Sequence, residues 1–237
     1  MKLSECHVKL DSKHEAASAL VDASNAYRKN DKTKAANCLS KAAEYFTDLG
    51  RLSVAAKHFK DMGEIFEEQG ETADAIVFYE KAADLYSGEE VTSTSNGCKL
   101  KVAALSATAE DYPKAQQLFT EVARSSLDSN LLKYSVKGYL LCAGLVLLAS
   151  PADSIAIENT LEKFVDMDAT FEDTREHNLL KELAEKMGSG DVDGFTAAVQ
   201  EFDSMSRLDS WKTTLLLRAK KRCASRAVAG GDDDDLT

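Results

Sequence analysis

Proline is scarce in this sequence, which has only Pro113 and Pro151 among its 237 residues. Glycine is infrequent as well, at 12 residues, whereas Ala, Leu, Glu and Lys are abundant. Residues that interrupt helices are therefore few, and residues that favour helices are many. This composition predicts an all-α protein.

Long apolar runs and paired cysteines are also missing. The longest apolar stretch, GYLLCAGLVLLA at 138–149, has 12 residues, and it predicts a buried core helix because a membrane-spanning helix needs about 20. The five cysteines include no CxxC pair, so we expect unpaired thiols in a reducing compartment. No signal peptide opens the chain, and the sequence therefore predicts a cytoplasmic protein.

Local signatures of catalysis are missing too. There is no GxxxxGK[ST] loop for a nucleotide phosphate, and HEAAS lacks the second histidine of HExxH. The four histidines are dispersed along the chain, so we expect no metal site, no cofactor and no catalytic residue. A net charge of −11 argues against nucleic-acid binding, which needs a basic surface. The chain is predicted to be a binding protein and not an enzyme.

What the sequence does contain is a repeat. Apolar residues recur at i, i+3, i+4, i+7 and i+8 from Ala35, Ala75 and Ala115, which lie 40 residues apart. This pattern forms one face of an amphipathic helix. A fifth copy keeps the same step at Phe195, whereas the fourth, which includes Ile157, fits only after a shift of two residues.

A second helical segment of similar length precedes each copy, so the repeating unit is a helical hairpin that must stack on its neighbours. Pro113 and Pro151 both suit the first turn of the helix that follows them. We predict an all-α fold of stacked antiparallel helical hairpins, a tetratricopeptide-like solenoid with a repeat of about 40 residues. Hairpin repeats are expected over 1–170, a C-terminal helical bundle over 171–228 and a flexible acidic tail over 229–237.

Residues that are 40 apart occupy equivalent places on successive hairpins. The series on the first helices consists of Lys57, Gly97, Lys137 and His177, with further cations near the same line: Lys99, Lys101, Lys133 and Arg175. Two interpretations stay open. These residues are either ordinary solvated lysines, or a basic stripe that attracts an acidic, elongated partner.

The last helical stretch, SRLDSWKTTLLLRAKKRC, departs from the repeat. It contains the only tryptophan, Trp211, and its apolar face is expected to cover the last repeat, with Asp209 as the N-cap. From 212 to 226 there are six basic residues and no acidic one, which exceeds what the dipole of a helix end needs. Two glycines then separate this stretch from the ending DDDDLT.

Several stretches resemble the alpha type of soluble NSF attachment proteins, in order and over nearly the whole chain. They are SKHEAASALVDASNAYRK, GRLSVAAKH, AIVFYEKAADLYSGEE, LLKYSVKGY, SRLDSWKTTLLLRAKK and the acidic ending with a penultimate leucine. The resemblance implies tetratricopeptide-like hairpins followed by a helical bundle. It also implies an adaptor that coats the syntaxin-type SNARE four-helix bundle, recruits the hexameric ATPase NSF, and associates peripherally with membranes through SNAREs.

The resemblance assigns roles to individual residues. Basic residues on the inner face of this family contact the acidic SNARE surface, and one family lysine falls at Gly97 here. The matching positions are Lys57, Lys137 and Arg175, with Lys101 and Lys133 nearby. The resemblance assigns NSF binding and activation to the tail: Asp232, Asp233, Asp234, Asp235 and Leu236.

The start of the chain departs from the family pattern. It begins at MKLSECHVKL, where the resemblance places residues beyond the first hairpins. The family's N-terminal loop, which dips into the bilayer, would have no counterpart, so we expect weakened direct membrane contact. One alternative function also stays open, a tetratricopeptide co-chaperone or scaffold whose groove binds the acidic C-terminal peptides of other proteins.

Overall fold

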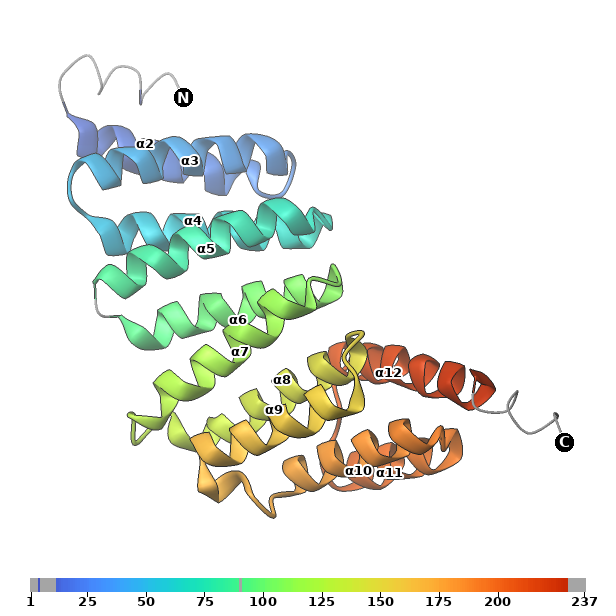
Figure 1. The fold of residues 1–237 in the computed structure, drawn as a ribbon. Helices are drawn as coiled ribbons and strands as arrows, with labels where there is room; N and C mark the ends of the chain where they lie inside the picture. The colour runs from blue at the N-terminus through green and yellow to red at the C-terminus, as the bar shows by residue number, and fades with distance from the viewer. Residues whose placement is uncertain (1–3, 5–11, 90, 230–237) are drawn as a thin grey trace, which may run out of the picture. The chain divides into compact units, whose positions relative to one another are not determined.

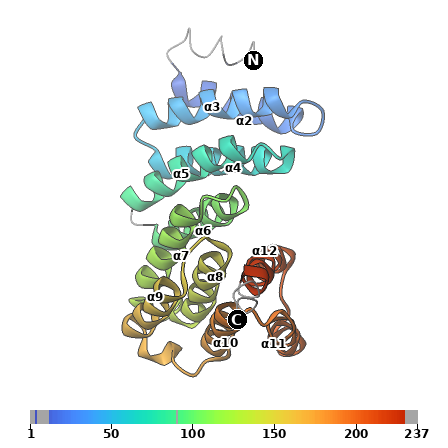
Figure 2. The same cartoon turned by 45° about the vertical axis from the view of Figure 1, so that its right-hand side comes forward.

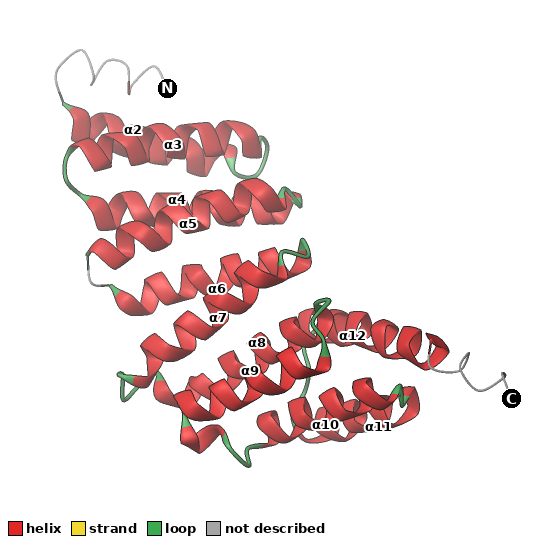
Figure 3. Cartoon of the chain, viewed as in Figure 1, coloured by secondary structure: helices red, strands yellow, loops and turns green. Residues whose placement is uncertain are grey.

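The computed structural model describes residue 4 and residues 12–89 and 91–229. Within these ranges the protein consists of helices joined by short loops, and no strand is present (Figure 3). The contacts divide the chain into two compact units, residues 1–105 and residues 106–237. The prediction of an all-α fold is confirmed. The boundary expected near residue 170 falls inside the second unit and stays a prediction.

The first unit is a stack of helical hairpins. Its helices are α2 (Lys13–Tyr27), α3 (Lys32–Asp48), α4 (Leu52–Gln69), α5 (Thr72–Gly88) and most of α6 (Thr92–Thr108). α2 packs against α3, α3 against α4, and α4 against α5 (Figure 1). Ala17, Ala42 and Ala55, from three successive helices, share one buried cluster with Phe46. Small side chains at these positions let the helices approach closely, so each hairpin buries its apolar face on the next.

The second unit surrounds one predominantly apolar helix, α8 (Val136–Ala149). Its elements after the end of α6 are α7 (Tyr112–Leu127), η1 (Lys133–Ser135), α8 (Val136–Ala149), α9 (Ser154–Met167), η2 (Ala169–Phe171), α10 (Arg175–Ser189), α11 (Val192–Met205) and α12 (Ser210–Ala229). α8 packs against α7, α10 and α12, and α12 lies beside α8 and α10 (Figure 2). Most of α8 is buried, which explains its apolar residues on every side and confirms the predicted core helix.

The helix boundaries reproduce the 40-residue step. The second helices of the first three hairpins start at Lys32, Thr72 and Tyr112, which are 40 residues apart. The fourth starts at Ser154, two residues late, and the fifth starts at Val192, which is 160 residues after Lys32. The shift of two residues in the fourth copy and the return to register in the fifth are therefore confirmed.

Aspartates begin several of these second helices. The carboxylates of Asp31, Asp111 and Asp191, at steps of 80, accept hydrogen bonds from backbone N–H groups three residues later, which is the N-cap arrangement. Pro113 lies in the first turn of α7, as predicted. The same prediction for Pro151 is wrong. Asp153 caps α9 by accepting from the N–H of Ala156 at 2.7 Å, so the helix starts at Ser154 and Pro151 lies in the loop before it.

α8 and α10 come into close contact at Gly144. A Cβ atom at this glycine would lie 2.6 Å from Cδ2 of Leu180 and 3.0 Å from its Cγ, closer than carbon atoms pack without displacement. Leu180 is completely buried. Gly138, in the first turn of the same helix, has no atom within 4 Å of the equivalent position. Only the first of these glycines is required by the packing.

Candidate functional site

The sequence predicts five cations that bind the SNARE surface, called the site cations below: Lys57, Lys101, Lys133, Lys137 and Arg175. The first unit contains two of them, Lys57 and Lys101. Lys57 is exposed on α4 and makes no hydrogen bond or ion pair with the described part of the chain. Gly97 lies five residues into α6, as Lys57 does in α4. Lys101, one turn beyond Gly97, is exposed on the same side of α6. Lys99 is two residues from Gly97 and therefore points to the opposite side of the helix, so it does not extend the series.

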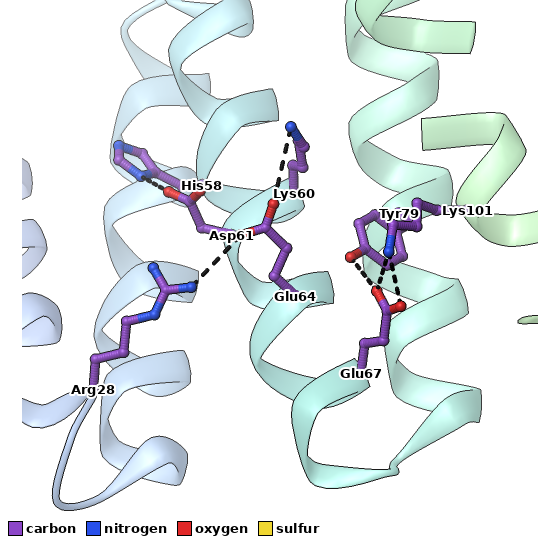
Figure 4. A network of polar contacts seen from close by, with 8 residues as sticks. All are labelled: Arg28, His58, Lys60, Asp61, Glu64, Glu67, Tyr79 and Lys101. Carbon is purple, nitrogen blue, oxygen red and sulfur yellow. Dashed lines mark hydrogen bonds and ion pairs between the residues drawn. The ribbon is translucent and has the colours of Figure 1, made fainter. Parts of the chain in front are cut away.

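Acidic side chains interleave with the cations of the first unit (Figure 4). The ammonium of Lys101 contacts both carboxylate oxygens of Glu67, at 2.8 and 3.0 Å. The hydroxyl of Tyr79 donates to the same carboxylate at 2.6 Å, and burial, followed by this carboxylate, raises the pKa of Tyr79. Glu64 binds Arg28 at 3.5 Å and Lys60 at 3.9 Å. This face is a mixed network of charges and not a uniform basic stripe.

The other three site cations lie in the second unit, at the first turns of two adjacent helices. Lys133 is in η1, directly before α8, and Lys137 follows one turn later. The ammonium of Lys137 lies 3.1 Å from Oε1 of Glu176 in the first turn of α10. Arg175, the first residue of α10, is exposed and makes no ion pair with any described residue. The ion pair thus brings Lys137 next to the residue that follows Arg175.

His177 does not belong to this group of cations. Its side chain is partly buried and its ring contacts that of Phe171, with centroids 5.4 Å apart. The reason is local, because the Thr174 hydroxyl accepts a hydrogen bond from the backbone N–H of His177 and fixes the start of α10. The 40-residue step therefore continues into α10 through Arg175 and not through the histidine.

The sequence interpretation missed two apolar residues next to Lys133. Leu131 is 88% exposed and Tyr134 is 76% exposed, and the ammonium of Lys133 lies 5.5 Å from the centre of the Tyr134 ring. Large apolar side chains this exposed mark an interaction site when polar groups surround them. The signal was available in LLKYS, where leucine and tyrosine stand in the connection between two predicted helices.

Two basic residues of α12, Arg218 and Arg222, have structural roles. Arg218 donates to the carbonyl oxygens of Ala107 and Thr108, at 2.8 and 3.0 Å, and so binds the end of α6. Arg222 donates to those of Leu148 and Ala152, at 2.8 and 3.0 Å, at the end of α8. Carbonyl groups in the last turn of a helix have no backbone donor within that helix. Two of the six basic residues therefore cap other helices and hold α12 in place.

The N-terminal end of α12 fits the sequence interpretation. The Asp209 carboxylate accepts from the backbone N–H of Lys212 at 2.8 Å, so it caps the helix as predicted. Trp211 packs against Phe119 of α7, with ring centroids 5.5 Å apart. The apolar face of α12 covers α8 and α10 as well as α11, which is a broader contact than the last repeat alone.

Other kinds of site are not visible in the described ranges. They contain no group of three or more His, Cys, Asp or Glu residues that could hold a metal ion. Among the helices that the structure describes, none has the length and apolar character needed to cross a membrane. The predicted NSF-binding residues Asp232, Asp233, Asp234, Asp235 and Leu236 lie outside the described residues.

Comparison with known proteins identifies the family. The model of the family described as "Soluble NSF attachment protein, SNAP" matches residues 1–224. The alpha-soluble NSF attachment protein of Vitis vinifera is 46% identical over 237 residues, which cover 100% of this chain and 81% of the relative. The protein of the same name from Mus musculus is 43% identical over 233 residues, 98% of this chain and 76% of the relative.

A fungal relative extends the match. The probable vesicular-fusion protein sec17 homolog of Schizosaccharomyces pombe is 40% identical over 237 residues, which cover 100% of this chain and 80% of the relative. The names of these relatives confirm the prediction of an attachment protein and not an enzyme, and none of them favours the co-chaperone alternative. The chain belongs to the soluble NSF attachment protein family.

Proposed function

We propose that this protein is an adaptor for SNARE disassembly. It binds an assembled, syntaxin-type SNARE four-helix bundle through its site cations, and it recruits and stimulates the hexameric ATPase NSF during vesicle fusion and intracellular transport. Membership of the family supports the attachment to NSF, and the vesicular-fusion name of the fungal relative supports the process. Association with membranes would then be peripheral and would pass through the SNAREs.

One observation in particular supports the proposal that the protein binds an acidic bundle. Lys133, Lys137 and Arg175 come from three separate elements, yet they gather at the first turns of α8 and α10. All three are exposed, so their charges act on a partner across solvent and steer its approach most strongly at low ionic strength.

The exposed Leu131 and Tyr134 complete this surface. A partner that covers them removes large apolar side chains from water, which contributes affinity that salt does not screen. The cations beside them supply orientation and a fast encounter with an acidic surface. A four-helix bundle that has acidic residues on its outside, with apolar patches between them, would complement both the cations and the apolar residues of this surface.

Neutralising the cations of the second unit tests this proposal. Lys137→Gln and Arg175→Gln are each expected to weaken binding of the assembled bundle by about fivefold, because an exposed ion pair contributes up to about 1 kcal/mol. The dissociation constant is measured by titration of the bundle at about 0.1 M salt. Lys181→Gln is the matched control, since Lys181 is an exposed cation on α10 that lies on another side of the helix from Arg175. An equal loss in the control would refute the assigned face.

The tail supplies a separate test of the NSF half of the proposal. Leu236→Ala is expected to leave the recruitment of NSF intact but to lower the stimulated ATP hydrolysis by about tenfold, because a buried leucine contributes about 1.5–3 kcal/mol. Phosphate release measures hydrolysis, and Thr237→Ala is the control. Undiminished stimulation with Leu236→Ala would exclude a role for the leucine.

Changing the four aspartates at 232–235 to asparagine is expected to weaken the recruitment of NSF in a salt-dependent way.

A further inference from the structure

Two of the five site cations are already bound by carboxylates of the same chain. Lys101 contacts both oxygens of Glu67, at 2.8 and 3.0 Å, and Lys137 lies 3.1 Å from Oε1 of Glu176. Lys57 and Arg175 make no such pair with any described residue. Before a partner arrives, the protein therefore presents full charge at some site cations and neutralised charge at others.

In both pairs the carboxylate is the fixed member and the lysine is the movable one. The Tyr79 hydroxyl, on a side chain that is completely buried, donates to the Glu67 carboxylate at 2.6 Å and so holds it in place (Figure 4). Glu176 is only 14% exposed, and its Oε2 atom is buried without a hydrogen-bond partner among the described residues. The lysines are 50% and 54% exposed. A lysine that turns toward a partner therefore leaves its carboxylate behind.

From this geometry we propose that Glu67 and Glu176 are internal competitors of the acidic partner at Lys101 and Lys137. The inference rests on the proposed function and specifies how that binding surface selects its partner. An acidic partner must take each lysine from a carboxylate that stays in place. It then faces that carboxylate as a like charge, which opposes association.

The pairs could instead help binding by holding each lysine in a productive rotamer. Fixing one such side chain in advance improves affinity by up to about tenfold. That benefit disappears once the lysine turns to the partner, whereas the repulsion from the anchored carboxylate persists in the complex. Competition is therefore the dominant effect, and the two glutamates lower affinity for every acidic partner.

The competition has a consequence for specificity. A short acidic peptide that reaches one lysine at a time gains little, because each contact replaces an existing ion pair. An elongated partner that contacts Lys57 or Arg175 as well gains contacts that displace nothing. The glutamates thus disfavour isolated acidic segments and favour a long, repeatedly acidic surface such as an assembled helical bundle.

Removing the charge of each glutamate tests the inference. Glu67→Gln and Glu176→Gln keep the size of the side chain and, at Glu67, an acceptor for the Tyr79 hydroxyl. Each is expected to tighten binding of the assembled bundle about three- to tenfold at 50 mM salt. The dependence of the dissociation constant on salt should also become steeper, because a site cation is released. Glu68→Gln and Glu172→Gln are the matched controls, since these exposed glutamates touch none of the site cations.

A second pair of variants separates competition from a change in folding. In a Lys101→Gln background, Glu67→Gln should tighten binding less than it does in the wild-type chain, because no lysine is left to release and only the repulsion between the carboxylate and the partner is relieved. If the wild-type chain bound the bundle, unchanged or weaker binding of both Glu67→Gln and Glu176→Gln at 50 mM salt would overturn the inference. A wild-type chain that failed to bind would overturn the proposed function, and a glutamine variant that then did bind would still support the competition.

Discussion

Replacing both Arg218 and Arg222 with alanine is expected to lower the free energy of unfolding of the second unit by about 4 kcal/mol, at about 2 kcal/mol for each guanidinium. Each arginine donates two hydrogen bonds of 2.8 and 3.0 Å to backbone carbonyl groups at or next to the end of another helix. Alanine removes these four hydrogen bonds, and with them the attachment of α12 to the ends of α6 and α8. Urea denaturation followed by the fluorescence of Trp211, the only tryptophan of the chain, measures the change.

Two further variants make this result specific. Lys221→Ala removes an exposed cation of α12 that has no partner in the described ranges, so the free energy of unfolding should change by no more than about 0.5 kcal/mol. Arg222→Lys should recover only part of the loss, because an ammonium cannot bridge two carbonyl groups as a guanidinium does. If the double alanine variant were as stable as Lys221→Ala, the arginines would not be what holds α12.

Alanine at Gly144 is expected to lower the free energy of unfolding by about 1–3 kcal/mol, because the core there is already filled. The added Cβ would lie 2.6 Å from Cδ2 of Leu180, which is completely buried, so the leucine or one of the two helices would have to shift. The same denaturation experiment reads out the effect, since α8 and α10 both belong to the second unit.

Gly138 supplies the control for this variant within the same helix. Nothing lies within 4 Å of a Cβ at Gly138, so Gly138→Ala should raise stability by about 0.5–1 kcal/mol through the better helix propensity of alanine. The two changes are chemically identical and have opposite expected signs. If Gly144→Ala were also stabilising, the contact between α8 and α10 would be looser than the structure shows.

The features that depend on local periodicity could be predicted from the sequence. The step of 40 residues, its shift in the fourth copy and the cap at Asp209 all follow from residue types at fixed spacings, and the structure contains each of them. Helical hairpins that stack on their sequence neighbours need the same residue types at equivalent positions, so they produce a regular repeat in the sequence. The error at Pro151 shows the limit, because a proline that suits a first turn suits a preceding loop equally well.

The features that depend on contacts between distant elements could not be predicted in this way. The pairing of Lys101 with Glu67 and of Lys137 with Glu176 joins residues 34 and 39 positions apart, and each lysine had several carboxylates within a similar distance in sequence. The same is true of Arg218 and Arg222, whose partners are backbone carbonyl groups with no sequence signature. Composition showed an excess of cations in α12, but only the structure shows that two of them cap other helices.

The large sequence separation between these arginines and their carbonyl partners also matters during translation of the chain. Arg222 follows Leu148 by 74 residues, and Arg218 follows Ala107 by 111. At roughly 5–20 residues per second, the carbonyl group of Leu148 leaves the peptidyl-transferase centre about 4–15 seconds before its arginine, and that of Ala107 about 6–22 seconds before. During synthesis, the carbonyl groups of Ala107 and Leu148 therefore lack these arginine donors until the last helix of the described chain has been translated.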